Sequence, residues 1–99
     1  MTEPPLLACS LDAAGLSAQR ARYAALAPDV RSTRRRPAEL VVGFGPAVDR
    51  DLLDEALAVE RECCPFFALE LDGTRLSVRV DRPDHVPALD AIAHALGAT

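Results

Sequence analysis

Apolar side chains follow helical spacing in three stretches of this chain, and the longest of them is residues 49–64. Apolar residues recur there every three to four positions, as they do in a helix with one buried side. They are Leu52, Leu53, Ala56, Leu57, Val59, Cys63 and Cys64. Asp49 is expected to cap the start of this helix. Pro65 is expected to end it at Cys64, because a residue before proline disfavours the helical conformation.

Two further helices are predicted near the ends of the chain. The first covers residues 13–27, with Asp12 as its N-cap and Pro28 after its last turn. Its buried side is expected to carry Leu16, Tyr23 and Leu26. The second covers residues 84–96 and stops at Gly97. Its buried side is expected to carry Val86, Leu89, Ile92, Ala93 and Leu96.

Stretches that alternate apolar and polar residues, or that are rich in β-branched residues, predict strands between the helices. Residues 6–11 are expected to form the first strand, and the two-residue period predicts Cys9 on its inward, leucine-bearing face. Residues 30–36 form a strongly polar strand, and residues 40–44 form a more apolar one that ends at a Gly-Pro pair.

A β-hairpin is predicted around Asp72-Gly73, a dipeptide typical of type I′ turns, because an alternating run lies on each side of it. The loop position fixes the register, and therefore which side chains face each other across the two strands. The expected pairs are Leu69–Leu76 and Phe67–Val78 on the core face, and Glu70–Arg75 and Phe66–Arg79 on the outer face.

The element order is strand, helix, one or two strands, helix, hairpin, helix. It predicts an α+β fold: a two-layer sandwich in which a mostly antiparallel sheet carries helices on one face, ferredoxin-like in outline. Residues 6–97 are expected to form this single domain, and residues 1–5, with two prolines, a flexible tail. The outer face of the sheet is polar at Glu70, Ser77 and Arg79. It is expected to be solvated or to form a homodimer interface.

Composition limits the classes of protein that fit. The chain has 99 residues, 49% of them hydrophobic, but no run of the roughly 18 to 20 apolar residues that a membrane span needs. Its first residues lack the basic segment and apolar run of a signal peptide, so we expect a cytoplasmic protein without a membrane partner. A net charge of −4 argues against nucleic acid as the main partner.

One basic cluster stands out in this acidic chain: Arg31, Arg34, Arg35 and Arg36 lie within the polar strand predicted at 30–36. The favoured interpretation is an exposed edge strand, whose charges prevent it from pairing with another chain. The alternative is a patch that binds an anionic ligand or nucleic acid.

Cys63 and Cys64 are the most unusual feature of the sequence. Adjacent cysteines lie about 3.8 Å apart at Cα, below the roughly 4.4 Å lower bound of ordinary disulfides, so they do not easily bridge each other. On a helix their side chains diverge by about 100°, so each is expected to face a different neighbour. The helix C-terminus and nearby Glu60 and Glu62 are expected to raise the pKa of both thiols. Metal capture therefore fits these thiols better than catalysis does.

The leading hypothesis joins Cys9, Cys63 and Cys64 in a site that binds or senses a soft ion such as Hg(II), Cu(I) or As(III). Zinc fits less well because it prefers four ligands and no C-x-x-C spacing is present. His94 and Glu60 are candidate auxiliary groups, Glu60 as a general base. The ordinary interpretation places Glu60 on a solvated face, and His85 is expected to be exposed.

Two alternatives compete with this metal site. In the first, the chain is a non-catalytic dimerisation or small-molecule-binding module, and its cysteines are small core residues. In the second and least favoured, it is a redox enzyme that cycles Cys9 with Cys63 or Cys64. The sequence contains no phosphate loop, nucleophile elbow or paired-carboxylate motif, so an enzyme is not the favoured interpretation.

The segments Cys9-Ser10-Leu11 and Glu62-Cys63-Cys64-Pro65-Phe66-Phe67 resemble a family of small bacterial proteins of uncharacterised function. That family carries a Cys-x-Leu strand and a Glu-Cys-Cys-Pro-Phe-Phe junction, and the resemblance runs from residue 8 to about residue 96. Relatives occur beside, or joined to, regulators of the mercury-responsive type. The resemblance thus implies a role for the three cysteines in metal stress, and a metal-responsive regulator as partner. It implies no enzymatic activity.

Overall fold

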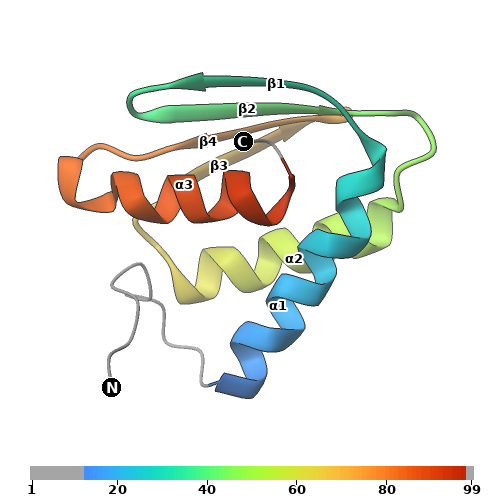
Figure 1. Ribbon diagram of the computed structural model, residues 1–99, viewed down its shortest axis with the longest axis horizontal. Coiled ribbons are helices and arrows are strands. Elements are labelled where there is room, and N and C mark those ends of the chain that lie inside the picture. The colour runs from blue at the N-terminus through green and yellow to red at the C-terminus, as the bar shows by residue number, and fades with distance from the viewer. Residues whose placement is uncertain (1–12, 98–99) are drawn as a thin grey trace.

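The computed structural model of this protein describes residues 13–97, so the strand predicted at 6–11, its Cys9 and the predicted tail lie outside the described residues. The strands form one layer and the helices form a second layer, as Figure 1 shows. In chain order they are α1 (Ala13–Leu26), the 3₁₀ turn η1 (Ala27–Asp29), β1 (Val30–Arg36), β2 (Glu39–Phe44), α2 (Arg50–Cys63), β3 (Ala68–Asp72), β4 (Arg75–Arg79), the 3₁₀ turn η2 (Pro83–His85) and α3 (Val86–Ala95).

The four described strands form one antiparallel sheet in the order β1-β2-β4-β3. All three helices lie on the same side of this sheet (Figure 1). The structure therefore confirms the predicted α+β class, broadly ferredoxin-like in outline. Its local connections are simple: β1–β2 and β3–β4 are hairpins, and the middle contact joins β2 to β4.

The core fills the space between the sheet and the helices. Alternate residues of β2 are buried, as the two-residue period of a strand requires, and β4 buries Leu76 and Val78 in the same way. The largest fully buried side chains come from all the layers: Leu26, Leu40, Val42, Leu53, Leu57, Leu76, Val78, Leu89 and Leu96. Most apolar positions predicted for the helices are buried, whereas Leu16, Leu52, Val59 and Val86 are half-buried.

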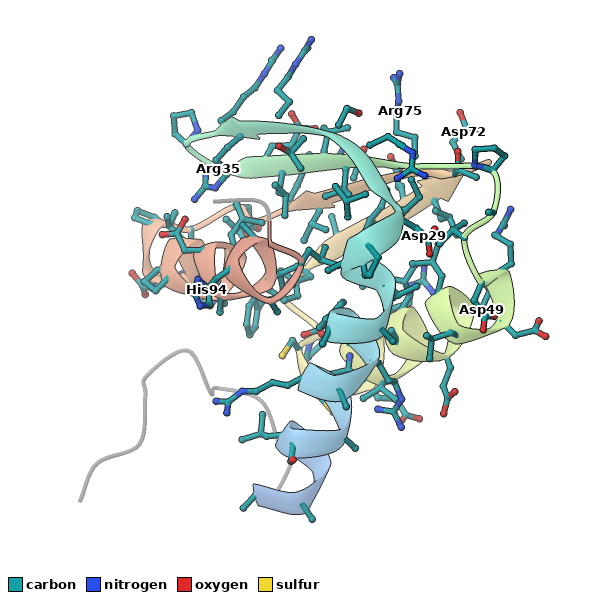
Figure 2. The ribbon with its side chains drawn as sticks, turned by 45° about the vertical axis from the view of Figure 1, so that its right-hand side comes forward. Asp29, Arg35, Asp49, Asp72, Arg75 and His94 are labelled. Carbon is teal, nitrogen blue, oxygen red and sulfur yellow. The ribbon has the colours of Figure 1, made fainter. Side chains whose placement is uncertain are left out.

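Strand β1 confirms the exposed edge strand predicted at 30–36. It lies at one edge of the sheet and is exposed at every residue after Val30. Arg35 points from β1 toward α3 (Figure 2) and its Nη2 lies 2.6 Å from Oδ1 of Asp90 on that helix. The ion pair between Arg35 and Asp90 therefore connects the edge strand β1 to α3 in the helical layer.

The hairpin forms where it was predicted, but with a different register. The loop is Gly73-Thr74, so Leu71 pairs with Leu76 and Leu69 with Val78. The predicted pairs were wrong by two residues, an even shift that keeps each side chain on its face. Gly73 has φ +64° and no non-glycine residue among 13–97 has positive φ. A positive φ at the first loop residue alone suits a type II′ turn, whereas type I′ needs it at both.

The ends of α2 follow the sequence prediction. Oδ1 of Asp49 accepts a hydrogen bond of 3.0 Å from the backbone N–H of Leu52, which caps the helix. At the other end Cys63 is the last helical residue and Cys64 has left helical geometry, with φ −129° and ψ 71°. Within residues 13–97 no helix combines the length and the apolar character needed to cross a bilayer.

Candidate functional site

A cavity of about 800 Å³ lies between the three helices. Its wall is mostly apolar and includes Leu16, Ala24, Val59, Phe67, Ala88, Ala91 and Ile92. Arg20, Asp90 and His94, which are exposed, also line it, so the cavity reaches the surface.

Three buried polar side chains meet in the wall of the cavity: Gln19 and Tyr23 from α1, and Glu60 from α2. The hydroxyl of Tyr23 donates a hydrogen bond of 2.6 Å to Oε1 of Glu60. The amide nitrogen Nε2 of Gln19 donates a second, of 3.0 Å, to the same oxygen. Both donors are neutral, so they stabilise the carboxylate without cancelling its charge.

Glu60 corrects the sequence interpretation, which placed it on a solvated face. Only 7% of the residue is exposed. The reason is its position on α2, because Glu60 follows Ala56 by four residues and Leu57 by three, and all three share the buried side of the helix. A carboxylate is tolerated there because α1 supplies two hydrogen-bond donors to it.

The remaining groups of Gln19 are also used. Its Nε2 donates a further bond of 2.8 Å to the carbonyl oxygen of Ala56, and its Oε1 accepts one of 2.8 Å from Arg22. Arg22 in turn lies 3.4 Å from a carboxylate oxygen of Glu55. This network fixes α1 against α2 and orients the Gln19 amide unambiguously, because each of its atoms has a partner of the right kind.

The environment of Tyr23 changes the pKa of its hydroxyl. Burial raises the pKa of Tyr23 well above its ordinary value of 10.0. The negative charge of Glu60 and the hydrogen bond to it raise the pKa further, whereas the hydrogen bond with Gln19 acts in the opposite direction. Tyr23 therefore stays protonated at physiological pH and acts as a hydrogen-bond donor at the cavity wall.

The two adjacent cysteines are both buried, and both line the cavity. The sequence had indicated that they would face different neighbours, because successive helical residues diverge. Cys64 is the non-helical residue after α2, so helical geometry does not determine the direction of its side chain, and the expectation of different neighbours stays a prediction. The structure thus brings Cys63, Cys64 and Glu60 to one cavity, at the end of α2.

His94 lines the cavity from α3. It is exposed near the end of that helix, on the side turned away from the sheet (Figure 2). The auxiliary group predicted from sequence therefore shares the cavity with the thiols. No group of three or more His, Cys, Asp or Glu residues within 13–97 is arranged to hold a metal ion. A three-thiol site would require Cys9, which lies outside this range.

His85 differs from its predicted exposed state. Its ring stacks on Phe66, with the ring centroids 4.0 Å apart and an interplanar angle of 21°, and the residue is half-buried. Its Nδ1 is buried and has no hydrogen-bond partner among the described residues. Phe66, which was expected to pair with Arg79 in the hairpin, lies in the turn before β3 and provides this stacking surface.

Comparisons with models of known protein families, with curated proteins and with solved structures gave no match to this chain. The resemblance to the Glu-Cys-Cys-Pro-Phe-Phe family, and the regulator partner that it implies, stay predictions.

Sequence reasoning missed the polar cluster of Gln19, Tyr23 and Glu60 as a unit, although a signal for it is present. Gln19 stands three residues after Leu16 and four before Tyr23, within the apolar stripe of its helix. Glu60 occupies the equivalent place on the second helix. A polar residue in the middle of an apolar stripe is the pattern that predicts a buried hydrogen-bonded pair.

Proposed function

We propose that this domain binds a small organic molecule in the cavity between α1, α2 and α3. The observation that carries the proposal is the cavity itself, because about 800 Å³ falls within the roughly 300–1,000 Å³ of small-molecule sites. Such sites combine an apolar wall with a few placed polar groups. Here the wall is supplied by three helices, and the polar groups are Gln19, Tyr23 and Glu60.

The arrangement favours binding over catalysis. Tyr23 keeps its proton, and Glu60 is held by two hydrogen bonds to one oxygen. Both groups are suited to orienting a ligand. The cysteines then contribute soft, polarisable surface to the wall.

Diphenylhexatriene, a neutral apolar dye that fluoresces when it leaves water, is a suitable probe. We expect saturable binding at one dye per chain. Ala24→Trp, at an exposed cavity position on α1, and Ala91→Trp, at a half-buried one on α3, should each weaken it by filling the space. Ala58→Trp is the matched control, because Ala58 is exposed on α2 and does not line the cavity.

The unfolding temperature of each variant shows whether it is folded. If Ala91→Trp does not fold, Ala24→Trp alone tests the proposal. Ala24 is exposed, and an exposed position tolerates a larger side chain. Dye binding that is equal in the parent, Ala24→Trp and Ala58→Trp would overturn the proposal.

A second candidate function is capture of a soft metal or metalloid ion, and one observation favours it: Cys63 and Cys64 line the same cavity. Two thiolates from neighbouring residues would provide part of a coordination sphere for Hg(II), Cu(I) or As(III), and Cys9 is the proposed third ligand. A metal-responsive regulator and a second copy of this chain are the partners proposed with it.

Native mass spectrometry with Hg(II), Cu(I) or arsenite tests this candidate. We expect the parent to retain the ion, the Cys63→Ser/Cys64→Ser variant to lose it, and Cys9→Ser to hold it more weakly. Equal retention by the parent and the double variant would show that the adjacent thiols are not the ligands. Diphenylhexatriene binding to the double variant distinguishes the two candidates, because the cavity proposal expects it to survive.

A further inference from the structure

Glu60 carries a carboxylate at the wall of a largely apolar cavity, and it forms no ion pair with a residue of 13–97. Its hydrogen-bond donors among the described residues are the hydroxyl of Tyr23 and the amide of Gln19, both neutral. The ion pairs between described residues use other carboxylates: Glu55, Glu70, Asp84 and Asp90. Arg22, the guanidinium bonded to this network, is directed at Gln19 and Glu55.

A buried charge without a counterion is costly, because the protein interior screens and solvates it less well than water does. Both described hydrogen bonds end on Oε1, so Oε2 is the carboxylate oxygen that a ligand's donor can approach. A cationic group placed there would gain a coulombic attraction to the carboxylate in a site of low dielectric constant, and a protonated amine would add a charge-assisted hydrogen bond.

The other charges that line the cavity do not alter this picture. Arg20 is exposed, so water and salt screen its charge, and the imidazole of His94 is exposed as well. Asp90, also exposed, is already paired with Arg35. The charge that lies deep in the wall is therefore negative. Tyr23 and Phe67 add aromatic rings to the same wall, and such rings attract organic cations.

We propose that the ligand of this cavity is an organic cation with an apolar body, an amine or quaternary ammonium compound, whose positive group lies against Glu60. This inference rests on the proposed function and specifies the class of its ligand. The apolar body fills the space between the helices, and the charge selects cations over neutral and anionic molecules of the same shape.

Three dyes with one skeleton test the charge preference: neutral diphenylhexatriene, its trimethylammonium derivative and its propionic acid derivative. We expect the cation to bind the parent tightest and the anion weakest, with about a tenfold or larger advantage for the cation over the neutral dye. Glu60→Gln should remove this advantage, so that the variant binds the cationic and the neutral dye with similar affinity; a glutamine oxygen can still accept the same two hydrogen bonds.

Glu62→Gln is the matched control. It removes the same unit of charge from an exposed position two residues away on α2, and it should leave the cation preference intact. Equal affinity of the parent for the neutral and cationic dyes would overturn the charge inference while the cavity proposal stands. A cation preference that survives Glu60→Gln, or that Glu62→Gln also removes, would overturn it as well. Failure of all three dyes to bind would contradict the cavity proposal itself.

Discussion

The hydroxyl of Tyr23 on α1 lies 2.6 Å from Oε1 of Glu60 on α2, and this hydrogen bond joins two residues that are 37 positions apart in sequence. Both residues are almost fully buried, and both line the cavity between the helices. The same contact therefore stabilises the packing of α1 on α2 and presents polar groups to the cavity. The packing of the two helices and the proposed binding site thus share the Tyr23–Glu60 pair.

Removal of the Tyr23 hydroxyl should destabilise the domain. Tyr23→Phe keeps the ring but takes one donor from a buried carboxylate, and we expect the free energy of unfolding to fall by about 1–3 kcal/mol. Urea unfolding of the parent and the variant measures this change. In a Glu60→Gln background the same substitution should cost less, because the acceptor is then uncharged. An equal cost in both backgrounds would argue against the hydrogen bond as the cause.

The stability of the protein should fall in alkali because of Tyr23. A tyrosine in an unfolded chain ionises at about pH 10, whereas Tyr23 in the folded protein keeps its proton to a higher pH. Between the two pKa values the unfolded chain binds fewer protons, so the free energy of unfolding falls as pH rises, by up to about 1.4 kcal/mol per pH unit. The stabilisation is fully present below about pH 10 and is lost as pH rises through the folded pKa.

The chain has one tyrosine and no tryptophan, so the ultraviolet absorbance of tyrosinate reports Tyr23 alone. We expect its titration midpoint in the folded protein to lie well above that of the unfolded chain. Glu60→Gln should lower the midpoint, because it removes a negative charge that raises the pKa. A midpoint that is the same in the folded and unfolded protein would contradict the buried site.

The cap of α2 should contribute measurably to stability. Asp49→Ala removes the side-chain acceptor for the N–H of Leu52 and should cost about 1 kcal/mol, whereas Asp49→Ser should retain most of it. Asp51→Ala is the control, because Asp51 lies in the first turn and acts on the helix dipole alone, worth roughly 0.3–1 kcal/mol. Thermal unfolding ranks the three variants. A smaller loss from Asp49→Ala than from Asp51→Ala would contradict the cap.

The turn register of the β3–β4 hairpin gives a further prediction. Gly73→Ala places a side chain at φ +64° and should cost about 1–2 kcal/mol, although nothing lies within 4 Å of the added carbon. Asp72 and Arg75 pair directly across the end of the hairpin (Figure 2), so Asp72→Ala should change stability by no more than about 0.5 kcal/mol. A large loss from Asp72→Ala would favour the type I′ turn expected from sequence.

Much of the fold could be predicted because local signals determine it. The Asp49 cap and Pro65 bound α2, apolar and β-branched residues before a Gly-Pro pair identified β2, and alternation identified the hairpin strands. The hairpin register could not be fixed in this way, because Gly73 fits the second position of a type I′ turn and the first position of a type II′ turn. The two pairings differ by two residues, so both keep the same side chains on the core face and the alternation pattern does not distinguish them. The choice depends on the pairing of β4 with β2, which is a tertiary contact.

The candidate site was predictable only in part. The cysteines drew attention to the end of α2, and the structure places them in the cavity wall. The burial of Glu60 depends on donors from α1, more than thirty residues earlier, and periodicity treats any charged residue as exposed. The cavity itself results from how three helices pack, which spacing within each helix does not determine.

The most direct test of the binding site is to map backbone amide chemical shifts of the labelled protein during titration with diphenylhexatriene. The account predicts that the largest changes fall on residues that line the cavity from all three helices, such as Tyr23, Glu60 and Ile92. Ser77 on the outer face of the sheet should not change. Changes concentrated at Ser77 and its neighbours, or scattered without regard to the cavity, would contradict a ligand site between the helices.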